Sequence, residues 1–472
     1  MNRAPGRRRF LKQTAAWGGG SLLGAAGLNW ISPAIWREPV PIDLNRGYWA
    51  RSQAPLNPPP AADLAVDVAV VGGGLTGLSA AFFIRQESPG KTVAVLEAKG
   101  CGNGASGRNG AMVLNMTADR FMVFSRDPAM DKRIYDLTSK NLLTLQGIGA
   151  LTGIDCELDI NGALQVFRQE SELAAAREYV KQANALGMPF EIWEAAQVAA
   201  VIGSRVYPGG FFDPSAGQVH PMKLVHAFKA AAESAGAVVY ESTRVVSIED
   251  GPEHVLRTDA GRTIRAKSLV LAGNAYTANS NALRNSIVPL REYVAMTRPL
   301  TDAQLAAIGW RARVPFNDSL TEVFYLGLTR DQRIHIGGGP PHYSFNNNAD
   351  EPLAAKASVR ALERELVRIF PTLAGVGFEA AWSGIVDWSL DAAPAVGCTG
   401  RHRNIFYGIG YSGHGVNLTS VFGRIISQLE AGRGKGWEEY PFVNRHLDYV
   451  PNEPFRWLAA KAGLAWFGAT EG

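Results

Sequence analysis

A nearly continuous apolar run opens the folded part of the chain. Residues 67–71 read Asp-Val-Ala-Val-Val, a pattern typical of a parallel strand that is buried on both faces. The run leads directly into a glycine-rich turn and then into an apolar stretch at 78–85, which predicts a helix. A second apolar run, 92–96, predicts the next strand. Strand, glycine turn, helix and strand in this order predict a Rossmann-like, dinucleotide-binding α/β unit.

The glycine turn has the GxGxxG spacing of a dinucleotide site. It consists of Gly72, Gly73, Gly74, Leu75, Thr76 and Gly77. The first glycine permits a tight turn, Gly74 lets a pyrophosphate approach the backbone, and Gly77 lets the helix pack on the strand. The phosphates are expected at the positive end of the helix. Glu97, which is followed by Ala98, lies about 20 residues past Gly77, the distance at which a carboxylate binds ribose hydroxyls.

A second loop of small residues follows, and it decides between the dinucleotides that such a unit can hold. Residues 104–111 read Gly-Ala-Ser-Gly-Arg-Asn-Gly-Ala. With this loop the chain resembles the D-amino-acid oxidase-like (DAO) family of FAD-dependent oxidoreductases, and within it the γ-glutamylputrescine oxidoreductase-like branch. The resemblance implies FAD as cofactor. It places along the pyrophosphate and isoalloxazine of FAD the loop residues Ser106, Gly107, Arg108, Asn109 and Gly110.

Later segments resemble the same family in the family's order. Val245 is a candidate for a backbone contact with adenine, and Gly273 and Asn274 are expected to close the nucleotide site. Residues 408–415 form a second GxGxxG, but no strand and acidic residue follow, so we interpret it as the turn before a helix at 416–430. The positive end of that helix would face the flavin. The segment adds to the flavin site Gly410, Ser412, Gly413, His414, Gly415 and Asn417.

The chemistry implied by the resemblance is oxidation of a C–N bond by hydride transfer to flavin, which gives an imine that water hydrolyses. His414 is the catalytic candidate for polarising flavin or substrate, and capping of the helix is its structural alternative. Sarcosine-oxidase-like members carry a carboxylate-binding lysine at the position of Asn417. A neutral amide there favours a polyamine-like or other alkyl amine. FAD is expected to be noncovalent, because residues 382–396 contain no cysteine.

Two other functions stay open on the sequence. One is an exported D-amino-acid or N-methyl-amino-acid dehydrogenase that passes electrons to a quinone. The other is a flavin-binding partner protein without turnover, since a fold does not guarantee catalysis. The sequence does not distinguish oxygen from quinone as the electron acceptor. The three cysteines are widely spaced, which indicates neither a disulfide framework nor a metal site.

The order of the segments predicts an α/β chain, α+β overall, with a discontinuous FAD-binding domain and a β-rich substrate domain. Three segments are assigned to the FAD-binding domain: 65–160, 211–286 and 375–445. Two segments are assigned to the substrate domain: 161–210 and 287–374. A tail helix is expected over 446–472, and 35–64 reads as an extended, Pro-rich arm.

The amino terminus accounts for most of the charge. The net charge is +4, but five basic residues and no acidic residue lie within 1–34. The rest of the chain is close to neutral and gives no basis for a nucleic-acid partner. Arg7-Arg8-Arg9 precede an apolar stretch at 14–28 that is too short to span a membrane, as in a twin-arginine (Tat) export signal. We therefore expect the Tat translocase as a partner and a periplasmic location, with membrane tethering only through an uncleaved leader.

Overall fold

The computed structural model describes residues 42–43, 47–51, 55–116, 127–280, 282–320, 322–348 and 355–471. Residues from Val40 onward form one compact unit. The leader expected over 1–34 lies outside the described residues. No helix in the described part of the chain is both long enough and apolar enough to cross a membrane.

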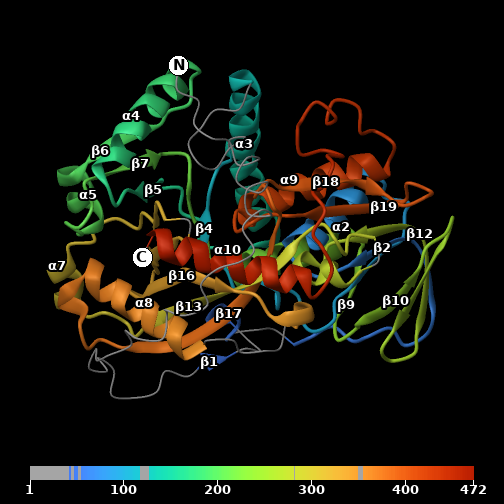
Figure 1. Ribbon diagram of the computed structural model, residues 1–472. Helices are drawn as coiled ribbons and strands as arrows, with labels where there is room; N and C mark the ends of the chain where they lie inside the picture. The colour runs from blue at the N-terminus through green and yellow to red at the C-terminus, as the bar shows by residue number, and fades with distance from the viewer. Residues whose placement is uncertain are drawn as a thin grey trace. The chain divides into compact units, whose positions relative to one another are not determined.

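An eight-stranded sheet contains the predicted dinucleotide-binding unit (Figure 1). Its strands are β2 (Leu64–Val71), β3 (Val93–Leu96), β9 (Val238–Tyr240), β10 (Val245–Glu249), β11 (His254–Thr258), β12 (Thr263–Leu271), β18 (Ala395–Thr399) and β19 (Ile405–Ile409). Strands β9, β3, β2, β12 and β19 are neighbours in that order and run parallel. If these five parallel strands are numbered 1 to 5 in chain order, their spatial order is 3-2-1-4-5, as in a doubly wound nucleotide-binding fold.

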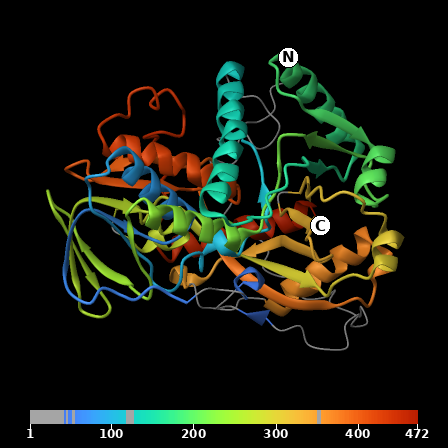
Figure 2. The ribbon, with the colours of Figure 1, turned by 180° about the vertical axis from the view of Figure 1, so that it is seen from behind.

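Three helices pack on this sheet: α2 (Leu75–Glu87), α6 (Pro221–Ser234) and α9 (Gly415–Glu430). A fourth helix, α3 (Pro128–Thr152), packs on α6 and α9. Apolar residues of these helices and of β2 and β3 form one core cluster. A Cβ on Gly423 would lie 2.2 Å from Ser79 Oγ, so the glycine lets α9 approach α2 closely. Figure 2 shows the long helix α3, in teal, from the opposite side.

A nine-stranded sheet forms the β-rich part. Its order is β1-β17-β13-β16-β15-β14-β5-β7-β6. The strands are β1 (Ile42–Asp43), β5 (Ala163–Val166), β6 (Glu191–Glu194), β7 (Gly209–Asp213), β13 (Val288–Thr297), β14 (Phe316–Asp318), β15 (Phe324–Leu328), β16 (Ile334–His342) and β17 (Phe378–Trp388). Its further helices are α4 (Glu170–Ala185), α5 (Ala195–Ile202), α7 (Asp302–Ile308), α8 (Ala355–Ile369) and α10 (Phe455–Glu471). Helix α8 packs on β13 and β16.

The remaining elements are short. They are the ribbon of β4 (Met112–Val113) and β8 (Gly217–Gln218), with the 3-10 helices η1 (Tyr48–Ala50), η2 (Ala105–Gly107), η3 (Asn274–Asn279), η4 (Phe345–Asn347) and η5 (Pro371–Leu373). The predicted fold class, an α/β nucleotide-binding part with a separate β-rich part, is confirmed.

Two segments differ from the sequence-based division. Strand β17 was placed in the FAD-binding segment 375–445, but it pairs with β13 along its length in the nine-stranded sheet. The arm 35–64 contains η1, in which Trp49 is only 5% exposed. An apolar side chain of this size is stabilised by burial, and so this part of the arm is packed against the protein. The remaining domain boundaries stay a prediction.

Candidate active site

The turn between β2 and α2 requires glycine at two positions. Gly72 has a φ of +113°, and a Cβ there would lie 2.5 Å from the Ala272 carbonyl oxygen. A Cβ on Gly77 would lie 2.0 Å from the Gly72 carbonyl oxygen. Both neighbours are backbone atoms, so no side-chain rotation can relieve the contact. The first turn of α2 thus lies against the carboxyl ends of β2 and β12, where open α/β sheets bind their ligands.

The N-terminus of α2 is joined to two distant segments. Its N-cap residue, Gly74, has no side chain, and Ser106 Oγ accepts a hydrogen bond from the Leu75 N–H at 2.9 Å. Thr76 Oγ1 shares a hydrogen bond of 2.7 Å with the Tyr411 hydroxyl of the last glycine segment. The second loop and the last glycine segment therefore meet at the positive end of one helix, a position suited to a pyrophosphate.

Glu97 lies beside this turn at the end of β3. Its Oε2 accepts a hydrogen bond from the Gly73 N–H at 2.7 Å. Burial raises the pKa of Glu97, although hydrogen bonds from backbone N–H groups act against the shift. The Thr243 N–H donates to the Glu97 carbonyl at 2.7 Å, two residues before β10 begins. Glu97, Ala98 and Val245 therefore lie near one another at the edge of the sheet that the sequence assigned to adenosine.

The side chains of the second loop fix the shape of that loop. Arg108 is 6% exposed, and its guanidinium donates to the carbonyls of Asn103 (2.6 Å) and of Ser383 on β17 (2.9 Å). The Asn109 amide binds backbone groups within the loop. A Cβ on Gly107 would lie 2.4 Å from the carbonyl oxygen of Gly102, just before the loop. Arg108 is thus a buried residue that joins the loop to the nine-stranded sheet, not a surface cation.

Three successive loop carbonyls each accept a hydrogen bond from a ring nitrogen. The pairs are Trp382 with Arg108 (2.9 Å), Trp49 with Asn109 (3.0 Å) and His335 with Gly110 (2.9 Å). We call these three rings the carbonyl clamp. Trp49 and His335 were not among the predicted site residues, because they lie on η1 and β16, far from the loop in sequence. The clamp joins the loop to the sheet of the substrate side.

A buried carboxylate anchors the last glycine segment. Asp387, on β17, is 1% exposed. Its carboxylate accepts hydrogen bonds from the Gly410 N–H (2.6 Å) and from Asn274 Nδ2 (3.1 Å), and its carbonyl accepts one from the Ser412 N–H (3.1 Å). Burial raises the pKa of Asp387 to about 7. Asn274 follows Gly273 just after β12, so the ends of β12, β17 and β19 are joined at one carboxylate.

His414 and Gly415 begin α9, after Gly413, which has a φ of +89°. His414 is the N-cap residue and half-buried, and its Nδ1 donates to the Ser412 carbonyl at 3.3 Å. Its side chain does not cap the helix. The catalytic role of His414 stays a prediction.

The Asn417 side chain is used in a contact between helices. It is 1% exposed, its Nδ2 donates to the Thr138 carbonyl at 2.9 Å, and its Oδ1 accepts from Asn141 Nδ2 at 2.9 Å, both on α3. The Asn417 side chain therefore faces α3, and its place in the flavin site stays a prediction. A buried amide needs several hydrogen-bond partners, and α3 supplies them. The backbone N–H of Asn417 still belongs to the first turn of α9.

A pocket of about 380 Å³ opens beside the second loop. Its lining includes Trp49, Ala111, Gln218, Arg313, Arg330 and His335. Ala111 directly follows the loop, and two of the three clamp rings line the pocket, so pocket and loop share a wall. Arg313 and Arg330 both form ion pairs with Asp159.

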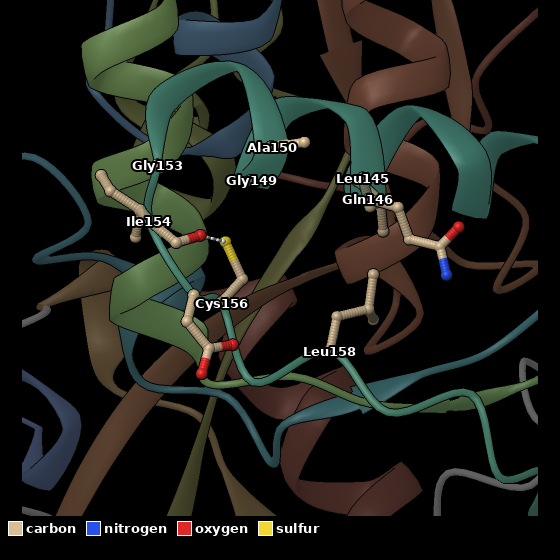
Figure 3. A pocket seen from close by; sticks show the side chains of 9 residues that line it. Leu145, Gln146, Gly149, Ala150, Gly153, Ile154, Cys156 and Leu158 are labelled. Carbon is tan, nitrogen blue, oxygen red and sulfur yellow. Dashed lines mark hydrogen bonds between the residues drawn. The ribbon is translucent and has the colours of Figure 1, made fainter.

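A different pocket, of about 320 Å³, lies at the C-terminal end of α3 (Figure 3). It is lined mostly by small and apolar residues, and it contains Cys156, whose thiol contacts the Ile154 carbonyl at 3.5 Å. Burial raises the pKa of Cys156 to about 11, so the thiolate is scarce at neutral pH. None of the predicted site residues lines this pocket.

The arrangement fits FAD. The glycine turn forms a cradle that a Cβ would fill, the N-termini of α2 and α9 lie close together, and Glu97 ends the strand beside the turn. Among the described residues, no group of three or more His, Cys, Asp or Glu could hold a metal ion.

Known proteins of similar sequence and structure share this fold. Gamma-glutamylputrescine oxidoreductase of Escherichia coli (strain K12) is 30% identical over 408 residues, 82% of this chain and 89% of that protein. Glycine oxidase of Geobacillus kaustophilus (strain HTA426) is 26% identical over 398 residues, 81% of this chain and 98% of that protein. The crystal structure of glycine oxidase from Geobacillus kaustophilus has a TM-score of 0.70 at 23% identity, covering 82% of this chain and 100% of that chain. The FAD dependent oxidoreductase (DAO) family model matches residues 67–429, and the chain therefore belongs to this family of FAD-dependent oxidoreductases.

Proposed function

We propose that this protein oxidises the C–N bond of an alkyl amine by hydride transfer to FAD, and that water then hydrolyses the imine. The observation that carries the proposal is the pocket of about 380 Å³ that shares a wall with the second loop. A substrate in this pocket would lie beside the loop that contacts the N-terminus of α2. Two relatives are named for γ-glutamylputrescine and glycine, and both compounds contain a C–N bond.

The chain's own part in this reaction is to position the reactants and to exclude water. Bound FAD supplies the acceptor for the hydride equivalent. The carbonyl clamp fixes the loop against the nine-stranded sheet, and alignment of this kind lowers the entropic part of the barrier. Trp49 and His335 are buried where they line the pocket, which limits access of water. His414, at the N-cap of α9, is our candidate for polarising flavin or substrate.

The charges around the pocket favour an amine over an amino acid. Arg313 and Arg330 pair with Asp159, and Arg51 pairs with Glu379. A substrate carboxylate would have to compete with these acidic partners for guanidinium N–H groups, whereas an alkyl amine would not.

Anaerobic stopped-flow mixing of the FAD-loaded protein with a panel of amines and the matching α-amino acids tests the proposal. We expect amines to bleach the flavin absorbance with a higher efficiency than the corresponding amino acids. Reoxidation by oxygen or by a quinone then identifies the acceptor class. Reduction by D-amino acids or N-methyl-amino acids alone would replace the amine proposal with the dehydrogenase alternative, and no bleaching by any compound would favour a non-catalytic partner.

We also propose that the Tat translocase exports the protein to the periplasm. The paired arginines and the short apolar stretch at 14–28 support this, as does the need to bind FAD before export of a folded protein. Changing Arg7 and Arg8 together to Lys should leave a folded, yellow protein in the cytoplasm. Fractionation with wild type as control measures this, and a double variant that still reaches the periplasm would contradict it.

A further inference from the structure

Among the described residues, two carboxylates line the pocket beside the second loop, and only one of them has an oxygen to spare. Asp331 uses both oxygens: Oδ1 accepts from the Thr329 hydroxyl at 2.6 Å, and Oδ2 accepts from Arg333 Nε at 2.7 Å. Glu157 accepts only through Oε1, from Lys223 Nζ at 2.6 Å. Its side chain is 18% exposed. Oε2 of Glu157 has no hydrogen-bond partner in the described part of the chain and is not closed off from solvent.

The backbone holds Glu157 in an unusual conformation. Its φ is +52°, in the left-handed region that residues with a side chain rarely adopt. Both sides of the turn are tied down. The Asp155 carboxylate accepts from the Glu157 N–H at 2.9 Å, and the Cys156 carbonyl accepts from the His220 N–H at 2.8 Å. Backbone strain of this kind is concentrated at ligand sites, and here it places a charged side chain where glycine would be favoured.

Glu157 lies at some distance from the second loop. Three extended segments lie side by side in this region: Met112 pairs with Gln218, and Gln218 pairs with Asp159 on its other side. Neighbouring strands are about 4.8 Å apart, so the segment that follows the loop and the segment of Glu157 are separated by about 10 Å. A nitrogen beside the loop and a group at Glu157 would therefore be the two ends of one elongated ligand.

The free oxygen of Glu157 is suited to an ammonium group that does not react. Lys223 shows that this carboxylate binds an alkylammonium ion, and Arg313, another cation of the pocket, is already paired with Asp159. The nitrogen at the carbon to be oxidised must be neutral, whereas a carboxylate partner favours the protonated form of an amine. One amino group cannot meet both demands. A substrate with two amino groups meets them at its two ends.

We propose that Glu157 binds the second, protonated amino group of the substrate and so selects diamines and polyamines over monoamines. This inference rests on the proposed function and names its substrate class. Oε2 accepts the N–H of the substrate ammonium, while Oε1 keeps its bond to Lys223. The Lys223 side chain is 40% exposed, and its charge opposes that of the substrate, so its removal should strengthen binding.

Three substitutions test the assignment. Glu157→Gln keeps the shape of the side chain and removes its charge. Lys223→Met removes the competing ammonium. Asp331→Asn is the matched control, because it neutralises the pocket carboxylate whose two oxygens are already bound. The probe is putrescine with two methyl groups on each carbon beside nitrogen, which leaves no hydrogen there to be transferred. Its partner probe is the monoamine in which hydrogen replaces one of the two amino groups.

Isothermal titration calorimetry of each probe into the FAD-loaded proteins measures Kd without turnover, and FAD content checks folding. We expect the wild type to bind the diamine more tightly than the monoamine. In Glu157→Gln the Kd of the diamine should rise about five- to tenfold, as for loss of a hydrogen bond to a charged group. In Lys223→Met it should fall about two- to fivefold, and in Asp331→Asn it should stay within about twofold. The Kd of the monoamine should change by less than about twofold in all three.

The inference is overturned if the wild type does not prefer the diamine, if Glu157→Gln keeps wild-type affinity for it, or if that variant weakens both probes equally. Weaker binding of the diamine by Lys223→Met would also overturn it, because the lysine would then support the site. The proposed function fails by a different observation, namely that no amine reduces the flavin of the wild-type protein.

Discussion

Asp387 lies outside the glycine segment 408–415 and yet fixes its shape. Its carboxylate accepts from the Gly410 N–H and from Asn274, and no cation is among the main causes of its pKa shift. Asn417 is the opposite case, because it lies within a motif and its side chain serves a contact between helices. The position of a residue in a sequence motif therefore did not determine the role of its side chain. That role was determined by the hydrogen-bond partners that surround the side chain in the folded protein.

Asp387 should make stability depend on pH. Burial raises its pKa from 3.8 in the unfolded chain to about 7 in the folded protein, so the folded state binds the proton more tightly. The contribution of Asp387 to stability should therefore fall as pH rises from about 4 to about 7, and stay constant above, with a slope of at most about 1.4 kcal/mol per pH unit. Asp387→Asn keeps an acceptor for Gly410 and removes this dependence.

Urea unfolding of wild type and Asp387→Asn between pH 4.5 and 8 measures the difference in the free energy of unfolding. Asp391→Asn is the matched control. Burial acts against the shift there, but Arg445 lowers the pKa of Asp391. Its stabilisation is therefore lost only below about pH 4, and the difference between wild type and Asp391→Asn should stay flat between pH 4.5 and 8. A difference between wild type and Asp387→Asn that is flat over this pH range would contradict the assignment.

At the scale of elements, the contact between β2 and α2 depends on glycine. The predicted strand 67–71 and helix 78–85 appear as β2 and α2, each a few residues longer than predicted. Their spacing could be predicted because the GxGxxG pattern is local and its steric reason is general. The carbonyl clamp could not be predicted from the sequence. Its donors come from η1, β16 and β17, which contact the loop only in the folded protein.

Gly77→Ala should disrupt this contact between elements. The added Cβ would lie 2.0 Å from the Gly72 carbonyl oxygen, which forces α2 away from the turn. We expect the free energy of unfolding to fall by about 1–3 kcal/mol, as for other overpacked cores, and the FAD content of the purified protein to fall with it. Gly90→Ala, in the connection from α2 to β3, is the control, because nothing lies within 4 Å of its added Cβ. Equal FAD content and stability in both variants would mean that the turn tolerates a side chain.

At the scale of the whole molecule, the nucleotide-binding sheet and the β-rich sheet meet around the second loop, and no cysteine lines the pocket beside that loop. The three cysteines are Cys101, Cys156 and Cys398, and none of them lines the pocket beside the loop. We therefore expect acid precipitation to release FAD into the supernatant, where its absorbance and fluorescence measure the yield. Colour retained in the pellet would indicate a covalent bond, and digestion would then show whether a pocket histidine carries it.

The sequence by itself determined the nucleotide-binding half of this protein. Apolar runs, glycine spacing and Glu97 follow local rules that act over about 30 residues, so strand, turn, helix and the DAO family could all be inferred without a structure. The tertiary structure decided which residues surround the substrate pocket. Trp49 and His335 are 286 residues apart in the sequence and converge on one loop. Their roles depend on pairing in a nine-stranded sheet whose neighbours are distant in the chain, and no local pattern encodes such contacts.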